Sequence, residues 1–398
     1  MKKQKNFLLF FMLVILTVSS GAQERTQNAL YEVIAEAGAR VNTSEMANEM
    51  VLRFNVFNRL FRFDPSLLGS PLRVRVFTDK QAYDKYITDR LGTTRNGALY
   101  LHYNQADRRE LVVHLGSPET APMLAHQAFI QYFRAFIANP PSWMREGFAI
   151  FYSTLRVASP DTVDYEENLF WLNAVKSMGA RLPPPNALFH TDISEALFEA
   201  PLVYPPLSAA SEEFQISSWA LISFMLNSGR DNFRTLTDCF MLLSPSATIV
   251  ENSRVIMKRL ELWNDFNFMN DDFRNYIASR KTFRELMDDG HSAYSRGDFM
   301  SAELSFIAAM DQRPSDFAPY YYIGLLYYEE KDFETADYYY KASEERGADQ
   351  ALINYALGIN AASAGRIQDA AVYLQIAAAL DPGRYRQRVE ELLRRIGL

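Results

Sequence analysis

The stretch that decides the fold of the larger part of the chain is SPETAPMLAHQAFIQYFRAFIANPPSWMREGFAIFYSTLR, residues 117–156. Apolar residues recur at helical spacing on both sides of Pro140-Pro141, and the two prolines interrupt that spacing. The first helix is expected to begin near Thr120, and Ser142 is a candidate N-cap for a second helix that ends near Leu155. The stretch therefore predicts two helices joined by a tight turn.

The residues before this helix pair carry both helical and strand patterns. Residues 26–64 are interpreted as two helices, the first because four apolar residues fall at i, i+3, i+4 and i+7: Leu30, Val33, Ile34 and Ala37. Three later runs are predicted to be strands: residues 72–76, 97–103 and 110–115. A helix capped by Asp79 is expected after the first of these strands. A small sheet followed by paired helices predicts an α+β, mostly helical domain.

The residues after the helix pair are first irregular and then helical again. Residues 161–206 are rich in proline, and we expect a covering segment with one helix around residues 166–177. Helical spacing returns in four segments: residues 217–227, 232–243, 247–260 and 271–279.

The C-terminal part contains an internal repeat. Gly290, Gly324 and Gly358 are 34 residues apart, and three further sets keep this spacing: Ala302, Ala336 and Ala370; Phe299, Phe333 and Ile367; and Pro314, Ala348 and Pro382. Gly and Ala allow two antiparallel helices to approach closely. The large apolar residues Phe299, Phe333 and Ile367 are expected to fill the gap between the helices. This pattern resembles the tetratricopeptide (TPR) repeat, an all-α solenoid. The repeats are placed at residues 283–316, 317–350 and 351–384, with residues 385–398 as a capping helix.

The helix pair carries candidate functional residues. His126-Gln127-Ala-Phe-Ile130 lies on the first helix, and Pro141-Ser-Trp-Met-Arg-Glu146-Gly147 opens the second. Together with the small sheet, this resembles the peptidase MA-like domain of gluzincin metallopeptidases, over residues 23–280. The resemblance implies a zincin-like fold with H-E-x-x-H on one helix and P-x-W-x-x-E-G-x-A on the next. By this resemblance, His126 matches the first zinc ligand and Glu146 the third. Gln127 stands at the position of the general base, and Ile130 stands at the position of the second ligand.

Two of these positions cannot support the chemistry. Ile130 has no lone pair for a metal, and the neutral amide of Gln127 cannot accept a proton from water. We therefore expect no catalytic residue and no bound metal or other cofactor. His126 is then expected to be a hydrogen-bonded core histidine, with Glu146 pairing it or Arg145.

The alternative is an active zinc metallohydrolase with a divergent ligand set that uses His126 and Glu146. His114 or His190 is the candidate that would complete such a set.

Composition bounds location and partners. Residues 1–22 combine three lysines, an apolar run and small residues, which predicts a secretory signal peptide; the alternative is an uncleaved anchor. Its removal would lower the formal net charge from −7 by the three lysines, to about −10. An acidic chain without a basic block argues against a nucleic-acid partner, and no later apolar run is long enough to span a membrane. We expect an exported protein, periplasmic or extracellular.

The repeats supply a candidate partner-binding surface. The first helices of the three repeats are expected to line a weakly charged, aromatic groove for a protein or peptide, formed by Met287, His291, Tyr294, Tyr321, Leu325, Tyr328, Tyr355 and Ile359. The alternative is that these tyrosines pack against the preceding domain or the capping helix. The favoured hypothesis is a protein-binding scaffold with an inactive hydrolase-like domain.

Overall fold

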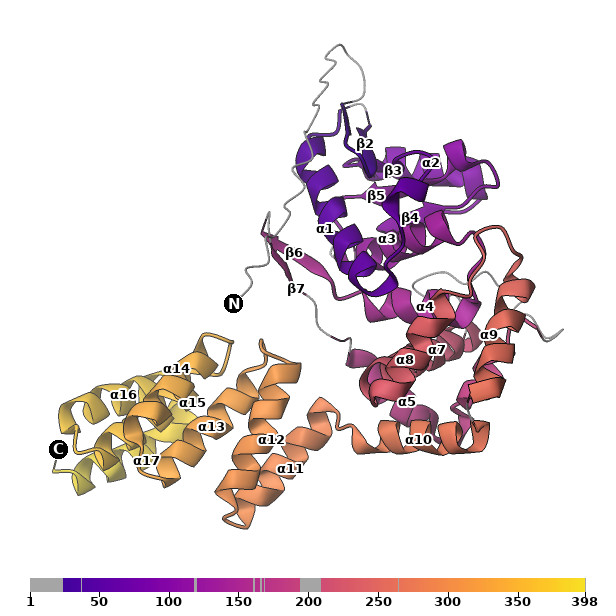
Figure 1. Cartoon of the computed structure of the whole chain (residues 1–398). Helices are drawn as coiled ribbons and strands as arrows, with labels where there is room; N and C mark the ends of the chain where they lie inside the picture. Colours follow the sequence, from indigo (N-terminus) through magenta and orange to yellow (C-terminus); the bar gives the residue numbers. More distant parts are fainter. Residues whose placement is uncertain are drawn as a thin grey trace, which may run out of the picture. The chain divides into compact units, whose positions relative to one another are not determined.

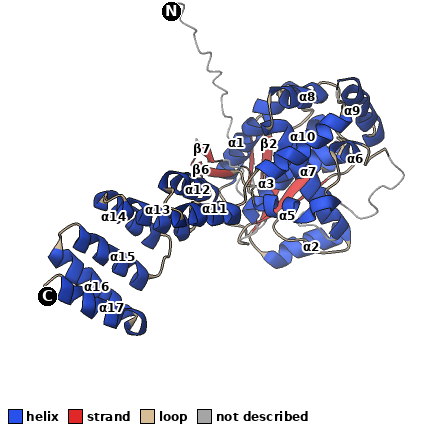
Figure 2. Ribbon diagram, turned by 90° about the horizontal axis from the view of Figure 1, so that it is seen from below, coloured by secondary structure: helices blue, strands red, loops and turns tan. Residues whose placement is uncertain are grey.

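The computed structural model describes residues 24–36, 38–117, 120–159, 162–164, 167, 169–193, 209–263 and 265–397. The expected signal peptide lies outside these residues. The chain divides between Ser279 and Arg280 into two compact units, the first combining strands and helices and the second built from helices (Figures 1 and 2). Among the helices of the described residues, none combines the length and the apolar character that crossing a membrane requires.

The first unit contains a five-stranded sheet in the order β1-β2-β3-β5-β4. The strands are β1 (Arg25–Gln27), β2 (Tyr31–Ala35), β3 (Leu72–Phe77), β4 (Ala98–Leu101) and β5 (Glu110–His114). The three inner strands β2, β3 and β5 run parallel, whereas β1 and β4 pair antiparallel to their neighbours. β4 is therefore an edge strand that runs against the central strands.

Helices cover both faces of this sheet. On one face, valines of β2, β3 and β5 share a core with aromatic residues of α1 (Thr43–Phe61) and α3 (Thr120–Phe136). On the other face, Phe77 and Val112 pack with Tyr83 and Ile87 of α2 (Lys80–Leu91). Short 3-10 turns, η1 (Pro65–Leu67) and η2 (Ala106–Arg108), connect the elements. α3 begins at Thr120, as the sequence predicts.

The expected helix at the start of residues 26–64 is wrong. Residues 31–35 form β2, whose five side chains are all buried, and the strand pairs in parallel with β3. A strand that is buried on both faces is apolar at consecutive positions, so its sequence also satisfies helical spacing.

The rest of the first unit is mainly helical. It comprises α4 (Ser142–Phe151), α5 (Phe170–Met178), η3 (Gly179–Arg181), α6 (Pro185–Phe189), α7 (Ala209–Asn227), α8 (Arg230–Phe240), α9 (Ile249–Trp263) and α10 (Phe266–Ser279). Two differences from expectation stand out. The N-cap position of α4 is occupied by Pro141 and not by Ser142, and the backbone N–H of Ser142 donates to Asp192 Oδ2 at 2.7 Å. The segment expected to be irregular, residues 161–206, contains η3 and α6. It also contains β7 (Thr162–Asp164), which forms a hairpin with β6 (Arg156–Ser159).

The second unit is a helical repeat that resembles TPR. Its helices pair as α11 (Phe283–Ser295) with α12 (Phe299–Gln312), α13 (Phe317–Glu329) with α14 (Phe333–Glu344), and α15 (Gln350–Ser363) with α16 (Ile367–Leu380). α17 (Pro382–Arg395) packs on α16. A capping box of Thr282 and Glu285 opens the array.

The repeated glycines are the points of closest helix approach within each pair. A Cβ atom on Gly290, Gly324 or Gly358 would lie 2.4, 2.7 or 2.7 Å from the side chain of Phe306, Tyr340 or Leu374, respectively. These three contact residues are themselves 34 residues apart and are fully or almost fully buried. The expectation that Phe299, Phe333 and Ile367 fill the gap is therefore wrong, since those residues start the second helices and are only partly buried.

Candidate functional site

A chain of polar contacts links the edge strand β4 to α3, α4 and α7. The backbone N–H of Tyr100 donates to Gln127 Oε1 at 3.0 Å, and Gln127 Nε2 lies 3.1 Å from His126 Nδ1. His126 Nε2 is 3.9 Å from Glu146 Oε2. Glu146 accepts from Arg145 Nε at 2.9 Å and from Gln215 Nε2 at 3.1 Å. The structure thus brings His126, Gln127 and Glu146 together.

Close packing of α4 against α7 positions Glu146. A Cβ atom at Gly147 would lie 2.4 Å from the carbonyl oxygen of Ser218, so only glycine fits there. This approach brings Gln215, one turn earlier on α7, to the Glu146 carboxylate. Trp143 is fully buried, as expected of a core residue. Ile130 is also buried and belongs to the apolar core.

The hydrogen bonds fix the tautomer of His126. Because Gln127 Oε1 accepts from the Tyr100 backbone, its Nε2 group faces His126 and donates to Nδ1. The proton of the neutral imidazole is then on Nε2, the atom that faces Glu146. Burial, followed by the nearby charge of Arg145, lowers the pKa of His126 to about 3. His126 is therefore a neutral, buried histidine, and its contact with Glu146 is not a charged pair near neutral pH.

These residues do not fit a zinc ion. A histidine binds zinc through the lone pair of an unprotonated ring nitrogen, whereas His126 Nε2 carries a proton in this hydrogen-bond arrangement. Both oxygens of Glu146 already accept from Arg145 and Gln215. Within the described ranges, no group of three His, Cys, Asp or Glu side chains is placed to hold a metal. His114 instead packs on the ring of Tyr83, and Nδ1 of His190 lies 2.7 Å from the carbonyl oxygen of Asn186.

A second group of residues beside β4 has no sequence motif. The Tyr100 hydroxyl lies 3.3 Å from His102 Nδ1. Burial and the charges of Arg134, Arg109 and Arg145, in that order, lower the pKa of His102 to about 3. Burial and the charge of Arg145 also lower the pKa of Arg134, to about 10. The positive charges of three arginines therefore disfavour protonation of the histidine that follows this strand.

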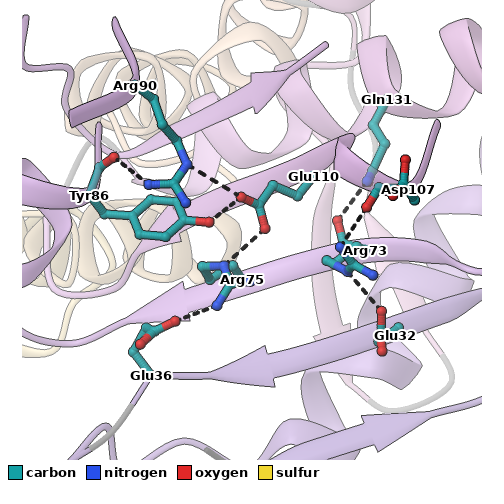
Figure 3. Close-up of polar contacts among 9 residues, drawn as sticks. All are labelled: Glu32, Glu36, Arg73, Arg75, Tyr86, Arg90, Asp107, Glu110 and Gln131. Atoms are coloured by element: carbon teal, nitrogen blue, oxygen red, sulfur yellow. Dashed lines mark hydrogen bonds and ion pairs between the residues drawn. The ribbon is translucent and has the colours of Figure 1, made fainter. Parts of the chain in front are cut away.

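A third polar group lies around the face of the sheet covered by α2, and each of its arginines has a carboxylate partner (Figure 3). Arg75 pairs with Glu36 and, through Nε at 2.9 Å, with Glu110. Glu110 also accepts from the Tyr86 hydroxyl. Along the same strand, Arg73 pairs with Glu32 at 2.8 Å. The pattern of Arg73 and Arg75 alternating with valines in β3 is the sequence signal that could have revealed this group.

In the repeat unit, most of the expected groove residues are partly buried on the first helices of the repeats. Met287 is an exception, since it is buried in the core of the first repeat. The hydroxyl of Tyr294 donates to Glu329 at 3.3 Å, and the Tyr328 hydroxyl lies 3.2 Å from Ser363 Oγ, each in the following repeat.

The other groove residues also make contacts within the array. The ring centroid of Tyr355 lies 4.7 Å from that of Tyr385 on α17, so this tyrosine packs against the capping helix. His291 packs on Tyr322 with ring centroids 4.2 Å apart. Tyr321, Leu325 and Ile359 remain partly buried.

Comparisons with known proteins yield only distant structural likeness. No protein-family model matches the chain, and no curated protein is significantly similar to it. The repeat unit is similar to the Arabidopsis OM64 TPR domain (15% identity, TM-score 0.27, covering 29% of this chain and 93% of that one). It is also similar to the first TPR of Spaghetti (RPAP3) bound to HSP90 peptide SRMEEVD (16%, 0.27, 29% and 89%). A third similar structure is the N-terminal domain of stress-induced protein-1 (STI-1) from C. elegans (23%, 0.25, 28% and 93%). The assignment of the repeat rests on the chain's own 34-residue geometry.

Proposed function

We propose that this chain is an exported protein-binding scaffold. In this proposal the repeat unit holds an extended peptide segment of a partner protein. The first unit is a peptidase MA-like fold that has lost its zinc site. The observation that carries the proposal is the regular array of three helix pairs, in which residues at equivalent positions recur on the first helices.

The chemistry of the array suits a peptide partner. The first helices present Tyr294, Tyr321 and Tyr328, whose rings offer large apolar contact area and whose hydroxyls offer hydrogen bonds. Tyr294 and Tyr328 hold equivalent positions and bond in the same direction along the array. No lysine or arginine stands at the expected groove positions, so an extended segment suits this surface better than a free C-terminal carboxylate.

The binding surface is tested by photo-crosslinking in cells that express the full chain. A crosslinking residue at Leu325 is expected to capture a discrete partner, whereas one at Tyr338, which is 67% exposed on the second helix of the same repeat, is not. Tyr328→Ala should weaken recovery of that partner by about 2 kcal/mol, or roughly 30-fold, if Tyr328 is an anchor. Tyr338→Ala is the matched control. Equal capture at both positions, or unchanged recovery with Tyr328→Ala, would refute binding on the first helices.

The proposed loss of the zinc site is supported by the tautomer of His126 and by the two hydrogen bonds to Glu146. The second candidate function, an active zinc hydrolase with a divergent ligand set, is favoured only by the close approach of His126 and Glu146. Elemental analysis of the purified chain separates the two. We expect substoichiometric zinc and a fold that survives chelation. One equivalent of zinc that disappears in His126→Ala would instead establish the hydrolase candidate.

A further inference from the structure

The outer face of α16, the second helix of the last repeat, differs from that of its counterpart α14 in the preceding repeat. Residues 34 apart occupy equivalent positions of successive repeats. At four positions a charged residue of the second repeat is replaced by an uncharged one in the third: Glu334 by Gln368, Lys341 by Gln375, Glu345 by Ala379 and Arg346 by Leu380. All four uncharged side chains are exposed, so packing within the repeat unit does not account for the replacements.

Three large apolar side chains lie on this outer face. Val372, Ile376 and Leu380 are four residues apart, so they form one apolar row along α16, and they are 56%, 39% and 51% exposed. The buried residues of α16 lie on the opposite side of the helix, which packs into the array: Ala370, Leu374 and Ala377. A continuous row, unlike single scattered apolar residues, marks an interaction surface.

The charges at the two ends of this row are opposite. Asp369, the only charged residue of α16, is exposed in its first turn. α17 follows directly after the last turn of α16, at the C-terminal end of the array (Figure 1), and Arg384, Arg386 and Arg388 are exposed in its first half. Within the described residues, none of these four side chains forms an ion pair, since the ion pairs of this region join other residues. One end of the apolar row is therefore negative and the other is positive.

We propose that α16 pairs with α16 of a second copy of this chain, antiparallel about a two-fold axis near Ile376. Ile376 then packs on its own counterpart, and Val372 packs on Leu380 of the other copy, so the apolar row is covered along its length. Asp369 of each copy lies beside the positive first half of α17 of the other copy, which gives two identical attractive contacts. A parallel pair would bring the arginines of both copies together, so the charges favour the antiparallel arrangement.

The pairing does not depend on peptide binding by the repeats. α16 is a second helix, whereas the proposed peptide surface lies on the first helices. Loss of either interaction would leave the other in place. Because each copy contributes mainly one helix, the interface is small, and we expect a weak dimer whose population rises with protein concentration.

Sedimentation equilibrium of the full chain, at concentrations from about 1 to about 300 µM, measures this dimer. The mass should rise from that of the monomer towards twice that value. Val372→Glu places a carboxylate in the apolar row and should weaken the dimer by about tenfold or more. Leu304→Glu is the matched control, since Leu304 holds the equivalent position on α12 and is 65% exposed. A monomer at every concentration of the wild type, or equal weakening by both substitutions, would overturn the proposal.

Charge reversal tests the antiparallel arrangement. Asp369→Arg and Arg384→Asp should each weaken the dimer by about threefold or more at low salt, because each dimer contains the contact twice. The double variant restores an attractive pair and should recover the affinity. A double variant weaker than both single variants would rule out this arrangement.

A disulfide supplies a readout that does not depend on a reduced affinity. Two copies of Ile376→Cys meet at the two-fold axis, so mild oxidation should link them, whereas Leu304→Cys should stay unlinked. The native Cys239 is buried and does not compete. Equal linkage of the two variants, or none in Ile376→Cys, would contradict the pairing.

Discussion

The first unit contains two groups of arginines that differ in how many carboxylate partners they have. On β3, Arg73 pairs with Glu32 and Arg75 with Glu36 and Glu110, so each arginine of this balanced group has a carboxylate partner. Beyond the end of β4, the charges of Arg109, Arg134 and Arg145 act on His102, and among the described residues only Arg145 has a carboxylate partner, Glu146; we call these three arginines the unbalanced group. In the first group each arginine is attracted to its carboxylate partner, whereas in the second Arg109 and Arg145 repel Arg134. Neutralising an arginine should therefore cost more stability in the first group than in the second.

The largest effect is expected from neutralising an arginine of the balanced group. Arg75→Gln removes the charge that pairs with Glu36 and with Glu110, whose side chain is 6% exposed; Glu110 keeps its contacts with Tyr86 and Arg90. Breaking a buried pair on one side costs about 3–5 kcal/mol, because the remaining charge stays buried. Denaturant unfolding, with the transition of the first unit followed separately, measures this loss. Lys85→Gln is the control, since Lys85 is 76% exposed and its pair with Asp89 contributes little. A loss below about 1 kcal/mol for Arg75→Gln would show that the balanced group is not structural.

The second prediction concerns pH, and it uses the histidine next to the unbalanced group. In the folded chain the pKa of His126 is lowered to about 3, mainly by burial, whereas an unfolded histidine titrates near 6.5. Stability is therefore complete above about pH 6.5 and is lost as the pH falls from there toward 3. The loss amounts to at most about 3 kcal/mol at pH 4. The difference in unfolding free energy between the wild type and His126→Asn, measured from pH 7 to pH 4, should shrink as the pH falls. Parallel curves for the two proteins would contradict a buried, neutral His126.

The balanced group was open to prediction from sequence, and the unbalanced group was not. Arg73 and Arg75 alternate with buried valines in β3, so a two-residue period places both on one face. His102, Arg109 and Arg134 share no period or motif. They meet only because β4 lies along α3, where the backbone of Tyr100 meets Gln127, and this register depends on residues distant in sequence. The motif on α3 and α4 did identify His126 and Glu146 as candidates, but the hydrogen bonds that set the tautomer come from β4 and α7.

The same contrast holds for the fold. The repeats were predictable because each helix pair is local and Gly290, Gly324 and Gly358 recur at the points of closest approach. β2 was mistaken for a helix because a central strand, buried on both faces, loses the alternation that marks strands. Its strand conformation is decided by pairing with β3, far along the chain.

The smallest effect is expected from making the same substitution in the unbalanced group. Arg134→Gln removes a charge that lies near Arg109 and Arg145, so relief of repulsion offsets the loss of the bond to Ala138. The free energy of unfolding should change by no more than about 1 kcal/mol, in either direction. Because the repulsion is screened by ions, the wild type should gain more from added sodium chloride than Arg134→Gln does. Unfolding curves at low and high salt measure both quantities. A loss comparable with that of Arg75→Gln would mean that Arg134 is needed by the fold itself, and the contrast between the two groups would then disappear.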